Sequence, residues 1–307
     1  MKKLSGCRDD LYNFAVGFFM GGANVIPGVS GGTMLFIMGA FAKLTNAIRD
    51  VACMETLKML CRGDWRGLYH RIQWRFLAGV GVGVLFAFAT LAKIFVWMLE
   101  KHQQLTFAFF FGLIAASIIT VNRQMKKWTA GAVISFIIST AVAFGVVSLV
   151  PLDGGTQWYM MILYGAICII AMILPGLSGS FLLLIFGQYQ RVWDAVGNLV
   201  HLQFHAEQLF MLCCLALGSI LGLGAFVHLL NFLMKNFYNA TVAALIGFMV
   251  GAIPRLWPWQ HQTASGRLTY DAPDYASLLR ILAAAAAGLA LVMIIEFFAR
   301  NKKQSGE

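Results

Sequence analysis

Long apolar segments separated by short polar loops run through nearly the whole of this chain of 307 residues. An α-helix needs about 20 apolar residues to span the hydrocarbon core of a membrane. The chain is 60% hydrophobic and 12% charged, whereas soluble domains are roughly 45–50% apolar and about 25% charged. One soluble core cannot bury that excess, so the sequence predicts an all-α polytopic integral membrane protein. A soluble enzyme, a disordered scaffold and a secreted disulfide domain are excluded.

The apolar segments form two groups, one in each half of the chain. The first two segments of each group are short and joined by a Pro/Gly-rich break, which favours a re-entrant hairpin, or a short two-helix pair, over two full spans. We predict Leu11–Val25, Thr33–Ala47, Phe76–Leu99, Leu105–Val121 and Thr129–Val150 in the first half, and Trp158–Leu174, Ser180–Val196, Gln208–Leu233, Ala240–Ile253 and Leu278–Ala299 in the second.

The basic residues predict the orientation of these segments, because Lys and Arg collect in cytoplasmic loops. Three of them, Lys101, Arg255 and Arg267, fall in predicted outer loops. Both termini are then cytoplasmic, and most of the net charge of +10 serves as orientation anchors. The sequence contains no run of like charges of the kind that indicates a nucleic-acid partner. The predicted inner residues are Lys2, Lys3, Arg8, Arg49, Lys58, Arg62, Arg66, Arg71, Arg123, Lys126, Lys127, Lys235, Arg300, Lys302 and Lys303.

An internal duplication divides the chain into two membrane repeats, residues 1–150 and 151–307. The segment IPGVSGG at 26–32 recurs as LPGLSGS at 174–180, 148 residues later. Gly39 matches Gly187, and Lys43 matches Arg191 at the same offset. Each repeat contains one hairpin and three transmembrane helices. Because three is odd, the second repeat is predicted to have the inverted topology, an architecture typical of alternating-access transporters.

The duplicated motif is predicted to form two hairpin tips that bind an anion near the membrane centre. At each tip a proline ends one helix, glycines permit unusual backbone conformations, and a new helix starts with unpaired N–H groups beside hydroxyls. The alternative is that the hydroxyls only cap these helices. The hairpin-tip residues are Pro27, Gly28, Pro175 and Gly176, and the predicted substrate-binding residues are Ser30, Gly31, Gly32, Thr33, Ser178, Gly179 and Ser180.

Two basic residues that follow the tips, Lys43 and Arg191, complete the predicted substrate-binding set. Each is expected either to attract an anionic head group at its own face of the membrane or to extend to the interface as an anchor. Lys93 and Glu296 are charges within apolar segments. Such charges are often functional, but both lie near segment ends, where extension to the interface is the simpler interpretation.

Enzyme and metal hypotheses fit the sequence less well. Both tips match G-x-S-G, and His228 is a candidate base for an intramembrane serine hydrolase, yet this histidine has no counterpart in the first repeat, where Ala89 stands. His201, His205 and Glu207 have a spacing that could hold zinc, but the motif H-E-x-x-H is absent. The six cysteines show no metal or disulfide spacing. We therefore predict no enzyme activity, no metal and no cofactor.

The first motif with its flanks, residues 21–33, and its echo at 174–181 resemble the PopT-type undecaprenyl phosphate translocases. The resemblance covers nearly the whole chain. It implies a flippase in the bacterial cytoplasmic (inner) membrane that moves undecaprenyl phosphate from the outer to the inner leaflet, recycling it for peptidoglycan and other envelope glycans. The expected partners are this lipid phosphate and the surrounding membrane lipids.

The direction of transport bears on energy coupling. A negative charge that moves inward works against an inside-negative potential, at about 2.3 kcal/mol per charge per 100 mV. Inward transport therefore calls for a coupling proton or sodium ion, or for consumption of the lipid inside. Two other functions stay open on the residues alone, a secondary transporter of a small anion and the intramembrane serine hydrolase.

Overall fold

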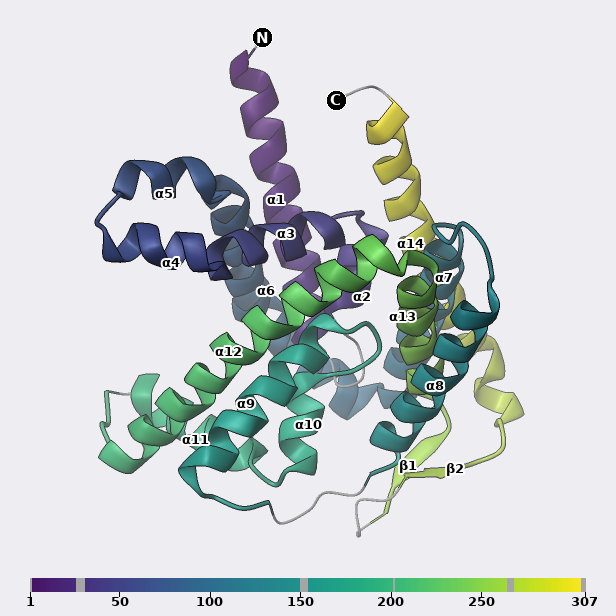
Figure 1. The fold of residues 1–307 in the computed structure, drawn as a ribbon. Helices are drawn as coiled ribbons and strands as arrows, with labels where there is room; N and C mark the ends of the chain where they lie inside the picture. Colours follow the sequence, from purple (N-terminus) through teal and green to yellow (C-terminus); the bar gives the residue numbers. More distant parts are fainter. Residues whose placement is uncertain (1, 26–30, 150–153, 201, 264–267, 305–307) are drawn as a thin grey trace.

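The computed structural model describes residues 2–25, 31–149, 154–200, 202–263 and 268–304. This part of the chain is almost entirely helical, and both ends of the chain lie on the same side of the molecule (Figure 1). Within these described ranges, six helices are long and apolar enough to cross a membrane. They match the six full spans that the sequence predicts, three in each half, and confirm an all-α polytopic membrane protein.

The helices of the first half are α1 (Lys2–Val25), α2 (Gly31–Ile37), α3 (Phe41–Ala52), α4 (Met54–Cys61), α5 (Trp65–Arg71), α6 (Trp74–Lys101), α7 (Gln103–Asn122) and α8 (Ala130–Val147). The second half contains α9 (Trp158–Ile173), α10 (Gly179–Ile185), α11 (Tyr189–Val200), α12 (Ala206–Asn236), α13 (Tyr238–Ala252), the 3-10 helix η1 (Ile253–Leu256), β1 (Gln260–Gln262), β2 (Leu268–Tyr270) and α14 (Tyr275–Gln304). The six long apolar helices are α6, α7, α8, α12, α13 with η1, and α14.

The short segments after the two tips differ from the prediction. Each was expected to be one helix, but each is two, α2 with α3 and α10 with α11. The breaks fall at Gly39 and Gly187, both with φ of +66°. Glycine is the residue that adopts this left-handed conformation without steric cost. The segment that follows each tip therefore contains a further turn.

Helices that occupy equivalent places in the two halves make equivalent contacts. Helix α1 packs along α6, and α9 packs along α12. A Cβ atom on Gly17 would lie 2.0 Å from the carbonyl oxygen of Val80, and one on Gly165 would lie 2.1 Å from that of Leu215. The glycines, 148 residues apart, thus allow the same close backbone approach in both halves.

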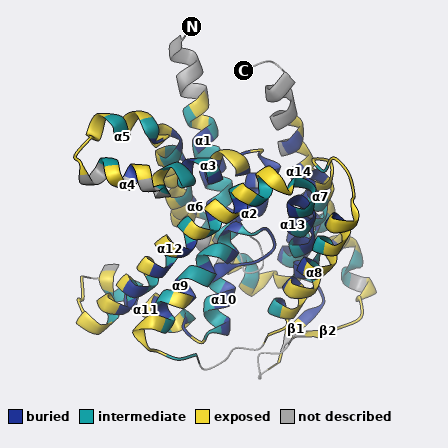
Figure 2. Cartoon of the chain, viewed as in Figure 1, coloured by how far each residue is buried: buried dark blue, intermediate teal, exposed yellow. Residues whose placement is uncertain are grey.

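The remaining long helices pair across the halves. Helix α7 packs along α14, and α13 packs along α8. In the apolar spans of α7 and α13, 56% of the residues are buried, against 28% or fewer in the other four. These two helices therefore form the centre of the molecule, as the dark ribbon in Figure 2 shows. The largest buried cluster draws on both halves, with Val16, Leu35 and Leu113 beside Leu245 and Met249.

Large apolar side chains cover the outside of the long helices. Leu85 on α6, Ile137 on α8 and Ile220 on α12 are 58% exposed or more. In water this pattern would be costly, but hydrocarbon solvates such side chains. The polar connections are more structured than expected. The loop after α3 forms two short helices, α4 and α5, and the loop after η1 forms an antiparallel hairpin in which Gln260 pairs with Tyr270.

Candidate functional site

The second hairpin tip is buried against helix α13. Pro175 and Gly176 follow the end of α9, and both are buried. Gly176 has φ of +89°, and a Cβ atom on it would lie 2.6 Å from the carbonyl oxygen of Phe248. A residue with a side chain would therefore meet both backbone strain and a direct clash. The glycine of this motif sets how closely the tip approaches α13.

The hydroxyls of the second tip face each other. The Oγ atoms of Ser178 and Ser180 lie 2.8 Å apart and share a hydrogen bond. Ser178 precedes α10 in the N-cap position, yet its side chain makes no capping hydrogen bond. The capping alternative therefore does not describe Ser178. With Ser178 6% exposed and Gly179 also buried, the tip presents two hydroxyls and backbone N–H groups in a largely enclosed place.

The first tip is described from Gly31 onward, so the predicted site residues Pro27, Gly28 and Ser30 lie outside the described residues. The N–H of Gly31 donates to Oδ1 of Asn24 at 2.8 Å, so this donor already has a partner. Gly32 is buried, and Thr33 is completely buried with no hydrogen-bond partner for its hydroxyl. A buried hydroxyl without a partner is costly, which makes Thr33 the first-tip residue best suited to receive a ligand.

Lys43 lies beside a polar cavity of about 410 Å³. Its Nζ atom is 4.3 Å from the centre of the Phe76 ring. Arg75 also lines the cavity and forms an ion pair with Asp10 at 2.7 Å. Asn13, only 4% exposed, adds an Oδ1 atom that has no hydrogen-bond partner. This mixed-charge surface suits an exposed polar head group at the end of the molecule where α3 lies.

Arg191 lies at the other end of the molecule, on α11 (Figure 1). Its Nη2 atom is 3.2 Å from Oε1 of Glu207. Its Nη1 atom is buried and has no hydrogen-bond partner. The structure thus places Lys43 and Arg191 at different ends of the molecule, and Arg191 forms an exposed ion pair with Glu207.

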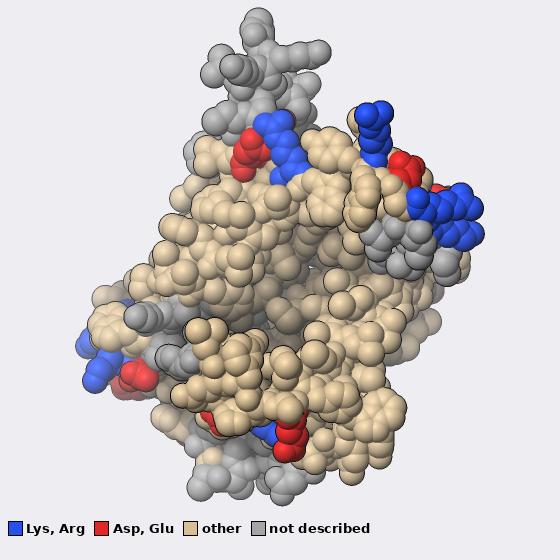
Figure 3. Space-filling view, turned by 90° about the vertical axis from the view of Figure 1, so that its left-hand side faces the viewer, with Lys and Arg blue, Asp and Glu red and all other residues tan. Residues whose placement is uncertain are grey.

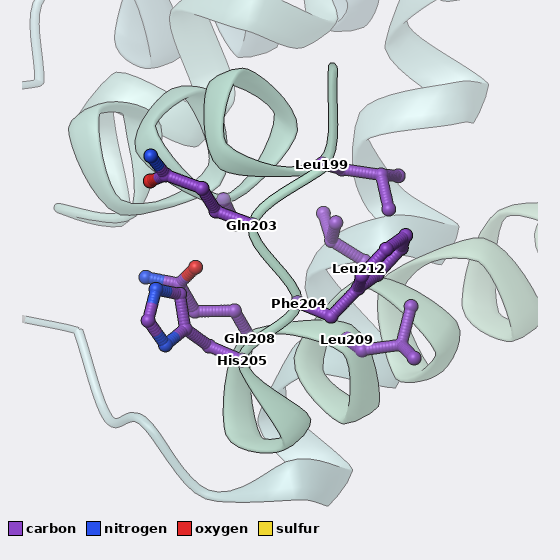
Figure 4. A pocket seen from close by; sticks show the side chains of 8 residues that line it. Leu199, Gln203, Phe204, His205, Gln208, Leu209 and Leu212 are labelled. Carbon is purple, nitrogen blue, oxygen red and sulfur yellow. The ribbon is translucent and has the colours of Figure 1, made fainter. Parts of the chain in front are cut away.

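The candidate histidines His228 and His205 lie within the described residues. His228 is exposed, and its Nδ1 atom bonds to the carbonyl oxygen of Gly224 on its own helix at 2.7 Å. His205 lines a pocket of about 10 Å³ with glutamines on one side and apolar side chains on the other (Figure 4). Such a pocket holds one water at most. Among the described residues no three His, Cys, Asp or Glu side chains cluster as metal ligands, and His201 lies outside them.

The charges within apolar segments differ from the expectation of simple extension to the interface. Glu296 on α14 is 7% exposed. Its Oε2 atom accepts a hydrogen bond from Thr120 at 2.8 Å, and its Oε1 atom lies 3.4 Å from Arg123. The carboxylate is therefore held inside the protein by α7. The side chain of Lys93 lies outside the described part of the structure.

Arg255 was predicted only as a basic residue of an outer loop, yet it lies next to the second tip. Its guanidinium carbon is 4.4 Å from the centre of the ring of Phe181, the residue after Ser180. A lone arginine beside Pro254 at the end of an apolar segment was the available signal. Sequence spacing alone does not bring that segment end to the tip.

The middle of the molecule carries a hollow in an uncharged band. On the face shown in Figure 3, Lys, Arg, Asp and Glu gather toward the two ends, and the hollow opens between them among other residues. Hydrocarbon favours an uncharged band of this kind, and interfaces favour the charged ends. The hollow therefore opens on the side of the molecule, between its two charged ends.

Comparison with known proteins finds two curated relatives and one matching family. A curated protein of Vibrio cholerae serotype O1 named polyprenyl-phosphate transporter is 35% identical over 272 residues, 89% of this chain and 85% of its own length. A Staphylococcus aureus protein of the same name is 27% identical, over 80% of this chain and 86% of its own. No solved structure matches the chain significantly. The profile of the VCA0040-like family, described as undecaprenyl phosphate translocase-like, matches residues 20–270, and the protein belongs to this family.

Proposed function

We propose that this protein transports a polyprenyl phosphate, specifically undecaprenyl phosphate, from the outer to the inner leaflet of the bacterial cytoplasmic membrane. The hollow in the uncharged band carries the proposal. A lipid phosphate needs shelter only for its head, while its tail can stay in the membrane. A lateral opening meets this requirement, whereas a small soluble anion requires an aqueous vestibule. The names of the two relatives support the same substrate class.

The head group passes between the two tips in this proposal. Ser178 and Ser180 donate to the phosphate at the second tip, and Ser30 with Thr33 does so at the first. Neutral donors bind an anion less tightly than a full cage of cations would, so the anion can be released again. Lys43 and Arg191 attract the head group at opposite faces. The protein acts as a transporter with no catalytic step.

Alternating access follows from two inverted repeats, residues 1–150 and 151–307. Equivalent helix pairs and the two left-handed glycines support the duplication. In Figure 1, α1 runs down from the N-terminus, while α9 runs up toward its tip, in support of inversion. Both termini are then cytoplasmic. Inward movement of the anion opposes the membrane potential. Transport is therefore driven in one of two ways: it is coupled to a proton or sodium ion, or consumption of the lipid inside the cell draws it inward.

Reconstitution tests this function directly. Fluorescent undecaprenyl phosphate is placed in proteoliposomes, and leaflet exchange is followed by quenching with a membrane-impermeant reductant. The wild-type protein should accelerate exchange. Loss of one hydrogen bond to a charged group costs about 1.5–3 kcal/mol, so Ser178→Ala and Ser30→Ala should each slow exchange roughly tenfold or more. Lys43→Gln and Arg191→Gln should slow it less, since both lie away from the tips.

Ser148→Ala is the matched control, because Ser148 is exposed and its hydroxyl bonds to the carbonyl oxygen of Phe144 on its own helix. No acceleration by the wild-type protein would contradict the proposal. Acceleration of inorganic phosphate flux without lipid exchange would indicate the small-anion transporter. A hydrolase predicts a different pattern, in which Ser178→Ala abolishes activity and Ser30→Ala has no effect.

A further inference from the structure

We propose that Arg255 binds the phosphate group of the lipid substrate where it enters the second hairpin tip. This inference rests on the proposed function and adds a charged binding residue to a site otherwise made of hydroxyls and backbone. It assigns the residue that selects a phosphorylated lipid over the corresponding alcohol.

Two separate contacts fix the position of Arg255 next to the tip. One is made by helix α13 and the other by η1. Gly176 packs directly against the backbone of Phe248 and Met249 on α13. Less than two helical turns further on, the guanidinium of Arg255 covers the ring of Phe181 at 4.4 Å. Ser180 immediately precedes Phe181 in the chain. The guanidinium and the paired serines therefore belong to one small region.

The charge of Arg255 has no acidic partner among the described residues. Its guanidinium contacts the ring of Phe181. The carboxylate of nearby Asp271 is already paired with His261, Nε2 to Oδ2 at 2.6 Å. A half-buried cation at the edge of a membrane region is costly unless an anion compensates it. A substrate phosphate supplies that anion.

Helix α7 occupies the place in the first half that α13 occupies in the second. The arginine at the end of α7, unlike Arg255, has an acidic partner within the protein. There Arg123 lies 3.4 Å from the buried carboxylate of Glu296. The arginine at that end is neutralised by the protein itself, and the arginine at the α13 end is not. This contrast separates a structural ion pair from a cation left available for a ligand.

The immediate surroundings also suit a lipid phosphate. A cavity of about 390 Å³ lies beside η1 and is lined by Phe144, Ile253, Pro254 and Trp257 together with Tyr270 and Asp271. The apolar side chains can contact the first isoprene units. The planar guanidinium can donate two parallel hydrogen bonds to phosphate oxygens. The backbone of Arg255 is held in place, since its carbonyl oxygen accepts a hydrogen bond from Nε2 of Gln260 at 2.6 Å.

Equilibrium binding to the full-length protein in lipid nanodiscs tests the inference. The probes are a fluorescent polyprenyl phosphate and the polyprenol with the same tail and label. Arg255→Gln should weaken binding of the phosphate roughly 10- to 100-fold, the range for one lost charge-assisted interaction, and leave polyprenol binding unchanged. Arg255→Lys should recover part of the affinity. Arg280→Gln, which removes an exposed arginine on α14, should bind both probes like the wild type.

Two results would overturn the inference. Arg255→Gln could bind the phosphate within twofold of the wild type. Alternatively, Arg255→Gln and Arg255→Lys could both lose affinity for the two probes equally, which would mean that the side chain only packs on Phe181. Failure of the proposed function looks different, because the wild-type protein would then not distinguish the polyprenyl phosphate from the polyprenol.

Discussion

At the scale of single residues, burial and hydrogen bonding separate side chains that the sequence treats alike. Thr33 and Ser178 are both hydroxyl residues predicted at the tips, although the offset matches Thr33 with Phe181 and Ser178 with Ser30. Thr33 has an unpartnered hydroxyl, and Ser178 bonds to Ser180. Lys43 and Arg191 match in the repeat, yet Lys43 lies over the ring of Phe76 and Arg191 forms an ion pair with Glu207. The motif predicts which residues form the tips. Their partners come from other segments and could not be predicted.

Cys53, at the end of α3, offers a residue-scale prediction about pH. Burial raises the pKa of its thiol, but hydrogen bonds with Thr56 and Arg71 and the positive charge of Arg71 outweigh burial, so the net pKa is lowered. The thiolate should therefore persist to lower pH than in an ordinary cysteine, and alkylation by iodoacetamide should stay fast as the pH falls toward neutrality. Arg71→Gln should raise the pKa and slow alkylation at neutral pH.

Mass spectrometry of the Cys53 peptide measures the rate across a pH series. The control is Arg66→Gln, which removes an exposed arginine from the same short helix, α5, and should leave the rate unchanged. Equal pH profiles for the wild type and Arg71→Gln would show that Arg71 does not set the reactivity of this thiol.

At the scale of elements, the two hairpins show what a pattern of apolar residues misses. The apolar character of Thr33–Ala47 and Ser180–Val196 continues across Gly39 and Gly187, so periodicity predicts one helix where the structure has two. The matching glycines were visible in the sequence, but a glycine within an apolar segment more often serves close packing. The polar loop after α3 gave no apolar signal for α4 and α5.

Gly39 supplies the element-scale prediction. It has φ of +66°, and a Cβ atom there would meet nothing within 4 Å, so the cost of Gly39→Ala is conformational alone. That cost is about 1–2 kcal/mol, and the midpoint of thermal unfolding in detergent should fall. Gly39→Asn should cost less, because asparagine tolerates the left-handed region. Gly81→Ala, which also has open space but a helical backbone, should not lower the midpoint. Equal effects of Gly39→Ala and Gly81→Ala would refute strain at Gly39.

At the scale of the whole molecule, the central contacts are made between the halves. Helix α7 of the first half packs on α14, and α13 of the second packs on α8. A Cβ atom on Gly112 would lie 1.9 Å from the carbonyl oxygen of Ala285, so these helices touch backbone to backbone. Each half leaves its central helix uncovered when it is alone. The repeats therefore depend on each other although they match in sequence.

Separate expression of the halves tests this dependence. Residues 1–150 and 151–307 produced together should copurify, and each produced alone should be degraded or aggregate. Gly112→Leu in the first half should prevent copurification, because the side chain has no room at the crossing of α7 and α14. Gly131→Leu is the matched control, since a Cβ atom there meets nothing within 4 Å. A stable, monodisperse first half on its own would contradict the prediction.

The sequence by itself determined that this protein is a helical membrane protein with six long spans, because length and hydropathy are local properties of each segment. It also contains two matching Pro-Gly-x-Ser-Gly motifs, which predict two hairpin tips. The tertiary structure decided which neighbours those tips have. It placed Arg255 beside Phe181, Glu296 beside Thr120 and α7 against α14, contacts between residues far apart in the chain. Long-range packing depends on the shapes of several helices at once, and no single segment of the sequence contains that information.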